Sequence, residues 1–177
     1  MQKLAKASTR TRLFNNNILI SPLCFFQLLF FTLLSLSSLA QKTNLKFTHI
    51  STKEGLSHAN VISILQDKRG FMWFGTRDGL NRYDGYKIKI YKSNPHDSTS
   101  LSNNLVQCMF EDSKGNFWIG TQGGGLNRLN RATDRFETFK HSDINAKSIA
   151  DNSVYSIIED HEGKIWIATG AGLNLFN

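Results

Sequence analysis

The sequence predicts an all-β protein: a β-propeller fragment of about two and a half four-stranded blades, preceded by a signal-peptide helix. Three observations predict this fold class. The 177-residue chain opens with an apolar leader. After it, one tryptophan-bearing phrase occurs three times, with tryptophans spaced 45 and 48 residues apart at Trp73, Trp118 and Trp166. Beyond the leader, no window shows apolar residues three and four positions apart over the length of a helix, as helical repeats would.

Residues 1–40 have the pattern of a secretory signal peptide. Four basic and no acidic residues lie in the first seventeen positions, and an almost wholly apolar run follows from Ile18 to Ala40. Small residues end the run, so cleavage is expected before Gln41. The alternative is an uncleaved membrane anchor, because a spanning helix needs about 20 apolar residues. Pro22 and Gln27 favour the signal peptide, and export would place the mature chain outside the cytoplasm.

The mature chain carries a small excess of positive charge. Of the 21 basic residues that give the whole chain its net charge of +7, 17 remain beyond residue 40, against 14 acidic residues. No basic run interleaved with aromatic residues follows the leader, so no nucleic-acid partner is expected for this segment. The remaining thiol, Cys108, is expected to be a small buried hydrophobe, because Ser63 and Ser156 stand at the matching positions.

Each copy of the repeat predicts short strands joined by turns. The first strand is an apolar, partly β-branched run, found at Val61–Gln66, Val106–Glu111 and Val154–Glu159. An Asp-to-Gly turn follows, in which Asp bonds to its own backbone and glycine takes a positive φ. The turn glycines are Gly70, Gly115 and Gly163. The second strand carries the tryptophan, and the turn after it ends in Gly79, Gly125 or Gly172.

The remaining strands bring the first two copies to four strands each. A third strand is predicted at Leu80–Asp84 in the first copy, and a fourth at Tyr86–Lys92 and Arg135–Lys140. Four short antiparallel strands in a unit of about 45 residues are typical of a propeller blade.

The predicted organisation has five segments: a signal peptide at 1–40, an N-terminal strand in 41–55, blades at 56–100 and 101–148, and a partial blade at 149–177. Within the second segment, Leu45–Ser51 matches the fourth strand of a blade. In a whole propeller this strand would complete the last blade and close the ring. A propeller needs about four to eight blades to close, so this piece is expected to leave apolar faces uncovered and to self-associate.

The repeated tryptophans and turn glycines are interpreted as structural residues of the blade. A tryptophan at the same strand position in every copy is expected to fill the space between blades, with its indole N–H bound to a backbone group. Cofactor stacking is the weaker alternative, and no cofactor is expected. Two positions later the chain has a small residue (Gly75, Gly120 or Ala168), as strands that converge on a narrow channel require.

The turn after the tryptophan strand is the candidate ligand-binding region. Its residues differ between the copies, and variation within a repeat falls on loops that often form the binding face. Arg77, Asp78 and Gln122 offer planar polar groups suited to sugar hydroxyls or carboxylates; plain solvation of a hairpin is the alternative. No catalytic residue is expected, because no Ser, His and Asp set recurs. No metal site is expected either, because the five histidines lack ligand spacing.

The phrase GLS...V..I..D..G..WFGT..GLNRYD, from Gly55 to Asp84, resembles the two-component regulator propeller repeat. The resemblance covers residues 45 to 177, and the two later copies match nearly as well. It implies the N-terminal part of the periplasmic sensor region of a Bacteroidetes-type hybrid two-component histidine kinase. Such sensors often respond to glycan fragments, so an oligo- or monosaccharide ligand is implied. The full-length form would be a homodimer anchored in the inner membrane.

The expected function is therefore extracytoplasmic ligand sensing within a two-component signal transduction receptor. The remaining blades and the signalling domains of a longer chain are the implied partners, since this chain ends before the membrane and kinase parts and is not itself expected to be an enzyme. A secreted propeller that binds glycan or protein without signalling is the alternative. A propeller enzyme such as a lyase or quinoprotein is the least favoured, because no paired acid and base is present.

Overall fold

The computed structural model describes residues 21–24, 26–27, 29–30 and 45–176, and the chain divides into two compact units, 1–47 and 48–177. In the first unit, residues 22–24, 26–27 and 29–30 are helical. Among the described residues, no helix has both the length and the apolar character needed to cross a membrane. Most of the expected signal peptide at 1–40 lies outside the described residues, so its assignment stays a prediction.

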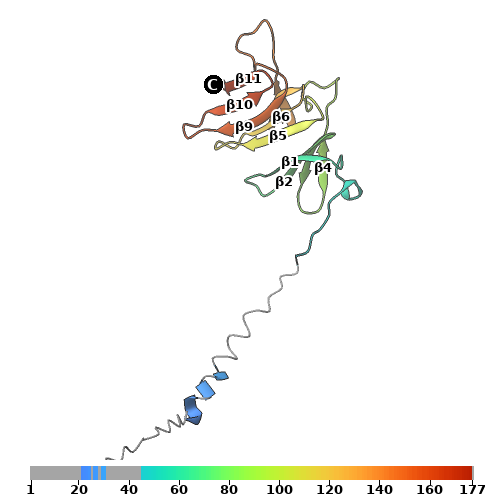
Figure 1. Cartoon of the computed structure of the whole chain (residues 1–177). Helices are drawn as coiled ribbons and strands as arrows, with labels where there is room; N and C mark the ends of the chain where they lie inside the picture. Colours follow the sequence, from blue (N-terminus) through green and yellow to red (C-terminus); the bar gives the residue numbers. More distant parts are fainter. Residues whose placement is uncertain (1–20, 25, 28, 31–44, 177) are drawn as a thin grey trace, which may run out of the picture. The chain divides into compact units, whose positions relative to one another are not determined.

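The second unit consists of three antiparallel sheets, which we call blades 1, 2 and 3 (Figure 1). A single 3-10 turn, η2 (Thr52–Glu54), precedes them. Blade 1 has the strand order β1 (Val61–Gln66), β2 (Met72–Thr76), β3 (Gly79–Tyr83) and β4 (Ile88–Tyr91). Blade 2 has the order β5 (Val106–Glu111), β6 (Phe117–Thr121), β7 (Gly125–Asn130) and β8 (Arg135–Phe139). Blade 3 contains β9 (Val154–Glu159), β10 (Ile165–Thr169) and β11 (Gly172–Phe176).

These sheets confirm the predicted all-β propeller fold, with four, four and three strands in successive blades. The first strand of each copy has the predicted bounds. The third strand of blade 1 begins one residue earlier than predicted, at Gly79, and β4 is shorter than the predicted Tyr86–Lys92. Hydrogen bonds of Asp84 explain the shorter strand: its side chain accepts the N–H groups of Tyr86 and Lys87, which closes a turn where a strand was expected.

The three copies also share a β-bulge at the same place. Val61 pairs with Thr76, but the next paired residue of β1 is Ser63, opposite Gly75. The same shift separates Val106 from Cys108 in blade 2 and Val154 from Ser156 in blade 3. In the first strand of each blade (β1, β5 and β9), one unpaired residue bends the strand and increases its twist. An irregularity that recurs in register indicates that the three sequences fold by one rule.

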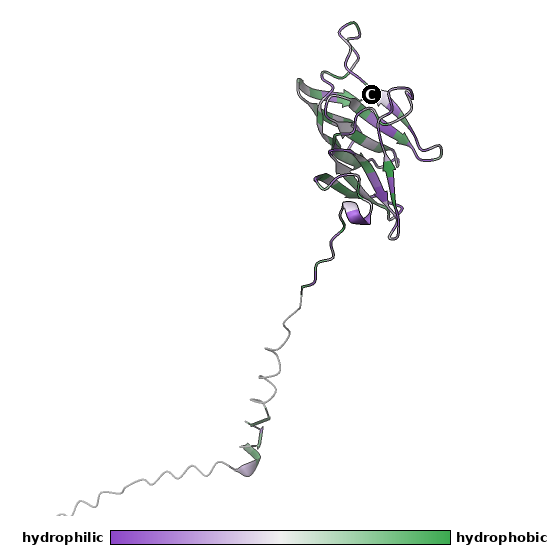
Figure 2. Ribbon diagram, turned by 90° about the vertical axis from the view of Figure 1, so that its right-hand side faces the viewer, coloured by the Kyte–Doolittle hydropathy of each residue, from purple (hydrophilic) through white to green (hydrophobic). Residues whose placement is uncertain are grey.

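Apolar residues between the blades form two cores. The first core joins blades 1 and 2 and contains Trp73, Leu80 and Tyr91 from blade 1 with Phe117 and Ile119 from blade 2. The second core joins blades 2 and 3 around Trp118, Leu126, Val154, Ile165 and Ile167. Green hydrophobic segments accordingly follow the strands in Figure 2. All five residues of β6 are buried. Among the blades that the structure describes, only blade 2 is covered on both faces, by blades 1 and 3.

Two glycines of the tryptophan strands allow the first strand of the next blade to approach closely. A Cβ atom added at Gly75 would lie 2.7 Å from Cγ1 of Val106 in the next blade, and one at Gly120 would lie 2.6 Å from Cγ1 of Val154. Real Cβ atoms do not come so near to carbon. A small residue is therefore required two positions after the tryptophan, because the first strand of the next blade leaves no room for a Cβ atom there.

The outward faces of blades 1 and 3 expose apolar side chains. Ile64 on β1 is 64% exposed, and Ile158 and Leu173 on blade 3 are 55% and 65% exposed. Phe110 and Leu126 occupy the positions in blade 2 that Ile158 and Leu173 occupy in blade 3. Because blade 3 covers that face of blade 2, Leu126 lies in the second core and Phe110 packs against it.

We expect the mature chain to self-associate through these faces, because contiguous exposed apolar surface and an open strand edge favour association between copies. Sedimentation velocity over a range of protein concentrations measures this directly. The average mass should rise with concentration, whereas a monodisperse monomer that unfolds cooperatively would contradict the expectation.

The segment Leu45–Ser51 belongs to no sheet in the structure. Leu45 and Phe47 are 83% and 81% exposed. At its end, Ser51 caps η2: its N–H donates to Oε2 of Glu54 at 2.7 Å, and its hydroxyl accepts the Lys53 N–H. A strand needs a partner strand to satisfy its backbone, and the segment has none here, so its role in closing a ring stays a prediction.

Candidate functional site

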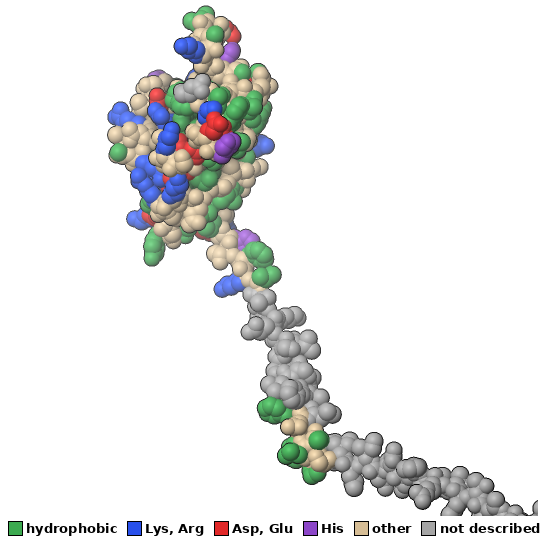
Figure 3. Space-filling model, turned by 90° about the vertical axis from the view of Figure 1, so that its left-hand side faces the viewer, with side chains coloured by type: hydrophobic (Ala, Val, Ile, Leu, Met, Phe, Trp, Pro, Cys, Tyr) green, Lys and Arg blue, Asp and Glu red, His purple; other side chains and the backbone are tan. Residues whose placement is uncertain are grey.

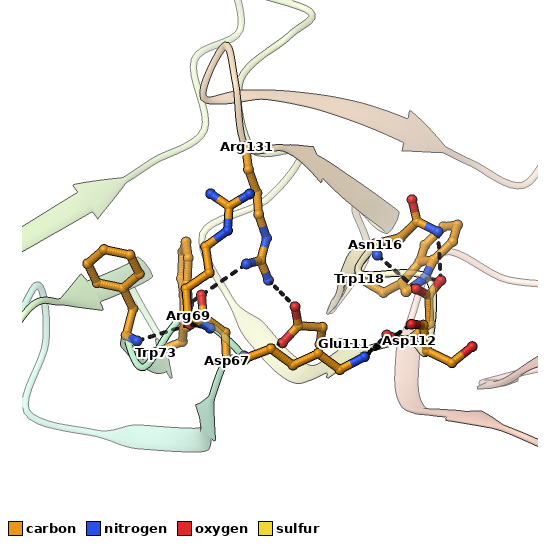
Figure 4. Close-up of polar contacts among 11 residues, drawn as sticks. Asp67, Arg69, Trp73, Glu111, Asp112, Asn116, Trp118 and Arg131 are labelled. Atoms are coloured by element: carbon orange, nitrogen blue, oxygen red, sulfur yellow. Dashed lines mark hydrogen bonds and ion pairs between the residues drawn. The ribbon is translucent and has the colours of Figure 1, made fainter.

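An aspartate holds the tryptophan of every blade. The indole N–H of Trp73 donates to Oδ2 of Asp67 at 2.9 Å. The equivalent pairs are Trp118 with Asp112, at 2.9 Å, and Trp166 with Asp160, at 2.7 Å. The partner is thus a carboxylate and not the backbone group that the sequence suggested. Figure 4 shows the first two pairs on neighbouring blades.

The same carboxylate also shapes the turn between the first two strands. Oδ1 of Asp67 accepts the backbone N–H groups of Arg69 and Phe71, both at 3.0 Å. The glycines of the three turns, Gly70, Gly115 and Gly163, have φ values of 90°, 83° and 79°. One side chain therefore satisfies both the turn and the buried indole. The constant six-residue spacing from Asp to Trp in all three copies is the signal that could have predicted it.

These bonds lower the pKa of two of the aspartates, Asp112 and Asp160. Burial alone would raise the pKa of Asp112, but hydrogen bonds from Trp118 and Asn116 outweigh burial and hold that pKa below its usual value. The Trp166 N–H lowers the pKa of Asp160 in the same way.

A carboxylate with a lowered folded-state pKa stabilises the fold fully only above its unfolded value of about 3.9. This stabilisation is lost as the pH falls through the lower folded value. We therefore expect the free energy of unfolding to fall between pH 5 and pH 2, as measured by urea titration with tryptophan fluorescence. Asp112→Asn, which has no carboxyl to titrate at this position, should show a shallower slope, and a stability that rises on acidification would contradict the assignment.

Arg131 joins blades 1 and 2 at the same end of the strands. It follows β7, and its two terminal nitrogens lie 3.2 Å from Oδ2 of Asp67 and 2.9 Å from Oε1 of Glu111. The side chains of these three residues are only 11%, 1% and 7% exposed. Figure 4 shows Arg131 reaching between the two acids, which come from different blades. The bridge pairs charges that would otherwise be costly to bury.

Backbone amides of each turn bind an acid of the next blade. The N–H of Lys68 donates to Oε2 of Glu111 at 2.7 Å, and its ammonium group donates to the carbonyl of Asp112. One blade later, the N–H and hydroxyl of Ser113 donate to Glu159, at 2.7 and 2.6 Å. The blades are therefore linked by directional polar contacts as well as by apolar packing.

The predicted ligand residues lie at the opposite end of the strands. Arg77 and Asp78 form the turn between β2 and β3, and Gln122 lies between β6 and β7. Asp78 pairs with Lys92 at 2.6 Å and accepts a hydrogen bond from Asn104, so it takes part in internal contacts. Gln122 accepts a bond from Gln107 at 3.0 Å, and Arg77 is exposed. Their role in ligand binding stays a prediction.

The described residues offer little for metal or thiol chemistry. Within that part of the chain, no three His, Cys, Asp or Glu side chains are grouped so that they could hold a metal ion. Burial raises the pKa of Cys108 to about 12, so its thiol stays protonated at neutral pH and is a poor nucleophile. Its sulfur lies 3.9 Å from the carbonyl oxygen of Val154 in the next blade. Cys108 thus packs at the interface between blades 2 and 3.

A hollow of about 600 Å³ opens beside the Arg131 bridge. We call it the arginine pocket and define it by six of its lining residues: Arg69, Asn116, Arg128, Arg131, Arg135 and Glu137. Lys and Arg side chains gather on one side of the face shown in Figure 3. The sequence did not predict this pocket, because Arg69 lies far along the chain from Arg128, Arg131 and Arg135 and joins them only in the fold.

Residues 55–78, 100–123 and 148–171 match the family model described as two component regulator propeller. This chain carries two-component regulator propeller repeats. Each match runs from the segment before a blade's first strand to the turn after the tryptophan strand, so each match covers the first two strands of one blade.

The propeller repeats of this chain resemble a histidine kinase and the extracellular domains of two bacterial regulatory systems. Over 77 residues, 44% of this chain, the sequence is 49% identical to histidine kinase P4 of Formosa agariphila. The extracellular domain of the hybrid two component system BT3049 of B. thetaiotaomicron superposes on 73% of this chain with a TM-score of 0.65 and 28% identity. The extracellular domain of BT4673, described as a one component system of the same organism, superposes on 73% of this chain with a TM-score of 0.61 and 31% identity. The chain spans 6% of histidine kinase P4 and 20% and 18% of the two extracellular-domain chains.

Proposed function

We propose that the chain is an extracytoplasmic ligand-sensing segment of a two-component signal transduction receptor of the hybrid histidine kinase type. The observation that carries the proposal is the match of all three blades to the two-component regulator propeller, together with the 49% identity to a segment of a histidine kinase. The extracellular domains that it resembles support a periplasmic location after export.

In this proposal the propeller provides a rigid scaffold and the contacts between blades provide the means of response. Ligand bound at a blade boundary changes the relative free energy of two blade arrangements only if it binds one of them better. Three polar contacts cross the blade boundaries, and such a change can make or break them: Arg131 with Asp67, Lys68 with Glu111, and Ser113 with Glu159. Further blades, a second copy of the receptor and membrane-anchored kinase parts would relay the change.

A chimera tests the sensing role. The blades of this chain would replace the matching segment of histidine kinase P4, and kinase output would be measured with a panel of mono- and oligosaccharides. The proposal predicts that at least one saccharide changes the output of the chimera. An output that no saccharide alters, in a chimera that is folded and phosphorylated, would contradict it.

A fusion of alkaline phosphatase to the end of the chain tests the location. The enzyme is active only after export, so we expect activity in the periplasmic fraction. Inactive fusion in the cytoplasm would refute export. Active fusion recovered mainly from the medium would instead support a secreted binding module.

A further inference from the structure

The arginine pocket lies across the boundary between blades 1 and 2. Arg69 comes from the turn between β1 and β2 in blade 1, and the other defining residues come from blade 2. Buried Leu129 and Phe136 form an apolar part of its wall. A hollow of about 600 Å³ falls within the range of roughly 300–1,000 Å³ that small-molecule sites occupy.

Two of the four arginines already have carboxylate partners. Arg131 pairs with Asp67 and Glu111, as described above. Arg128 binds Glu137 through two of its nitrogens. Among the residues that the structure describes, no ion pair is formed by the guanidinium groups of Arg69 and Arg135. The pocket therefore has four positive groups and one negative group in its lining, and two of the positive groups form no salt bridge, although the charge of Arg135 acts on the nearby carboxylate of Asp97.

Neighbouring guanidinium groups without a counter-ion repel one another. Figure 4 shows the Arg69 side chain lying alongside that of Arg131, whose charge is already shared by two acids of the blades. An oxyanion relieves this repulsion, since a guanidinium group presents paired N–H donors that match a carboxylate or a sulfate. Around these groups, the side-chain oxygen of Asn116, the side-chain nitrogen of Asn130 and the Thr133 hydroxyl can bind hydroxyls, while the other amide atoms of Asn116 and Asn130 bond within the protein.

We infer that the arginine pocket binds the oxyanion of an acidic saccharide, a carboxylate or a sulfate, through Arg69 and Arg135. The inference rests on the proposed sensing function and adds to it the chemical class of the ligand and a site away from the Arg77 turn. Because Arg69 belongs to blade 1 and Arg135 to blade 2, the bound anion links two blades. Ligand binding is thereby coupled to the contact between blades on which the sensing proposal relies.

Calorimetric titration of the full chain with three disaccharides of equal size tests the site. One probe carries a uronate carboxylate, one carries a sulfate and the third is neutral. We expect one or both anionic probes to bind, with affinity that falls as salt is added, and the neutral probe to bind at least tenfold more weakly. Preference between the first two probes identifies the oxyanion. Absence of binding by both anionic probes, or equal binding by the neutral one, overturns the inference.

Substitutions locate the binding. Arg69→Gln and Arg135→Gln should each weaken binding of the anionic probe at least tenfold, and both side chains are exposed, so the fold should tolerate the changes. Lys147→Gln makes the same change of charge in the loop after β8, at the opposite end of the strands, and should bind normally. Tryptophan fluorescence verifies that each variant is folded. Unchanged affinity in both arginine variants, or equal loss in Lys147→Gln, overturns the site.

The chimera separates this inference from the proposed function. If kinase output still depends on saccharide after Arg69→Gln and Arg135→Gln, the sensing role is supported and the role of the arginine pocket is contradicted. The opposite result is also informative. If the chimera binds the anion, both substitutions abolish that binding and kinase output never changes, the pocket is supported and the sensing role is contradicted.

Discussion

Replacing Asp67 with alanine is expected to lower the free energy of unfolding by about 3–5 kcal/mol, the range for breaking a buried ion pair. Asp67 accepts the Trp73 indole N–H and two turn amides, and it also pairs with Arg131. The change would leave the Arg131 charge, 11% exposed, with Glu111 alone, and would leave the Trp73 N–H buried without an acceptor. Urea unfolding followed by circular dichroism measures the loss.

The same substitution in blade 3 is the matched control. Asp160 makes the equivalent bonds to its turn and to Trp166, but no arginine contacts it among the described residues and the indole is half-buried. Asp160→Ala should therefore lower the free energy of unfolding much less than Asp67→Ala, because water can replace the lost hydrogen bonds at this accessible site. Asp67→Asn, which keeps an acceptor but loses the charge, should fall between the two. Equal losses for Asp67→Ala and Asp160→Ala would contradict the role of Arg131.

Replacing Trp118 with alanine is expected to cost about 3–5 kcal/mol, the usual range for removing a large aromatic side chain from a core. Trp118 is 1% exposed and packs between blades 2 and 3, with ring centroids 6.1 Å from Phe139 and 5.0 Å from Phe176. Its removal opens a cavity on the face that blade 3 covers. The loss should appear in the midpoint of urea unfolding.

Trp166→Ala is the matched control at the same position of the next blade. Trp166 borders an open apolar hollow of about 400 Å³ with Ile158 and Leu173, so part of its surface is in water already. We expect this change to cost less than half as much as Trp118→Ala, because the transferred area is smaller. A cost as large as that of Trp118→Ala would show that burial between blades does not set the difference.

The fold could be predicted from the sequence because the first three strands of a blade are each encoded three times. The strands at Val61–Gln66, Val106–Glu111 and Val154–Glu159 have matching apolar patterns and matching turns, so one correct interpretation supports the others. Leu45–Ser51 shows the limit of that reasoning. Its pattern matches a fourth strand, but pattern alone supplies no partner strand.

The candidate site was harder to predict, since it depends on residues that are not repeated. Arg131 stands where blade 1 has Gly85, so comparison of the copies gives no reason to select it. Its two acids lie 64 and 20 positions away in the chain: Asp67 meets it across the boundary between blades 1 and 2, and Glu111 meets it within blade 2. Asp67 itself was recognised as a turn former, but its second role as the tryptophan acceptor depends on burial.

The central claim is that each blade is kept folded by the neighbours that cover it, and native-state hydrogen exchange measured residue by residue tests it most directly. Local stability follows the density of buried contacts. The account predicts that amides of β6, in the blade covered on both sides, exchange most slowly, and that those of β1 and β9 exchange faster through the exposed faces of blades 1 and 3. Equal protection in all three blades, or slowest exchange in β9 and β10, would contradict it.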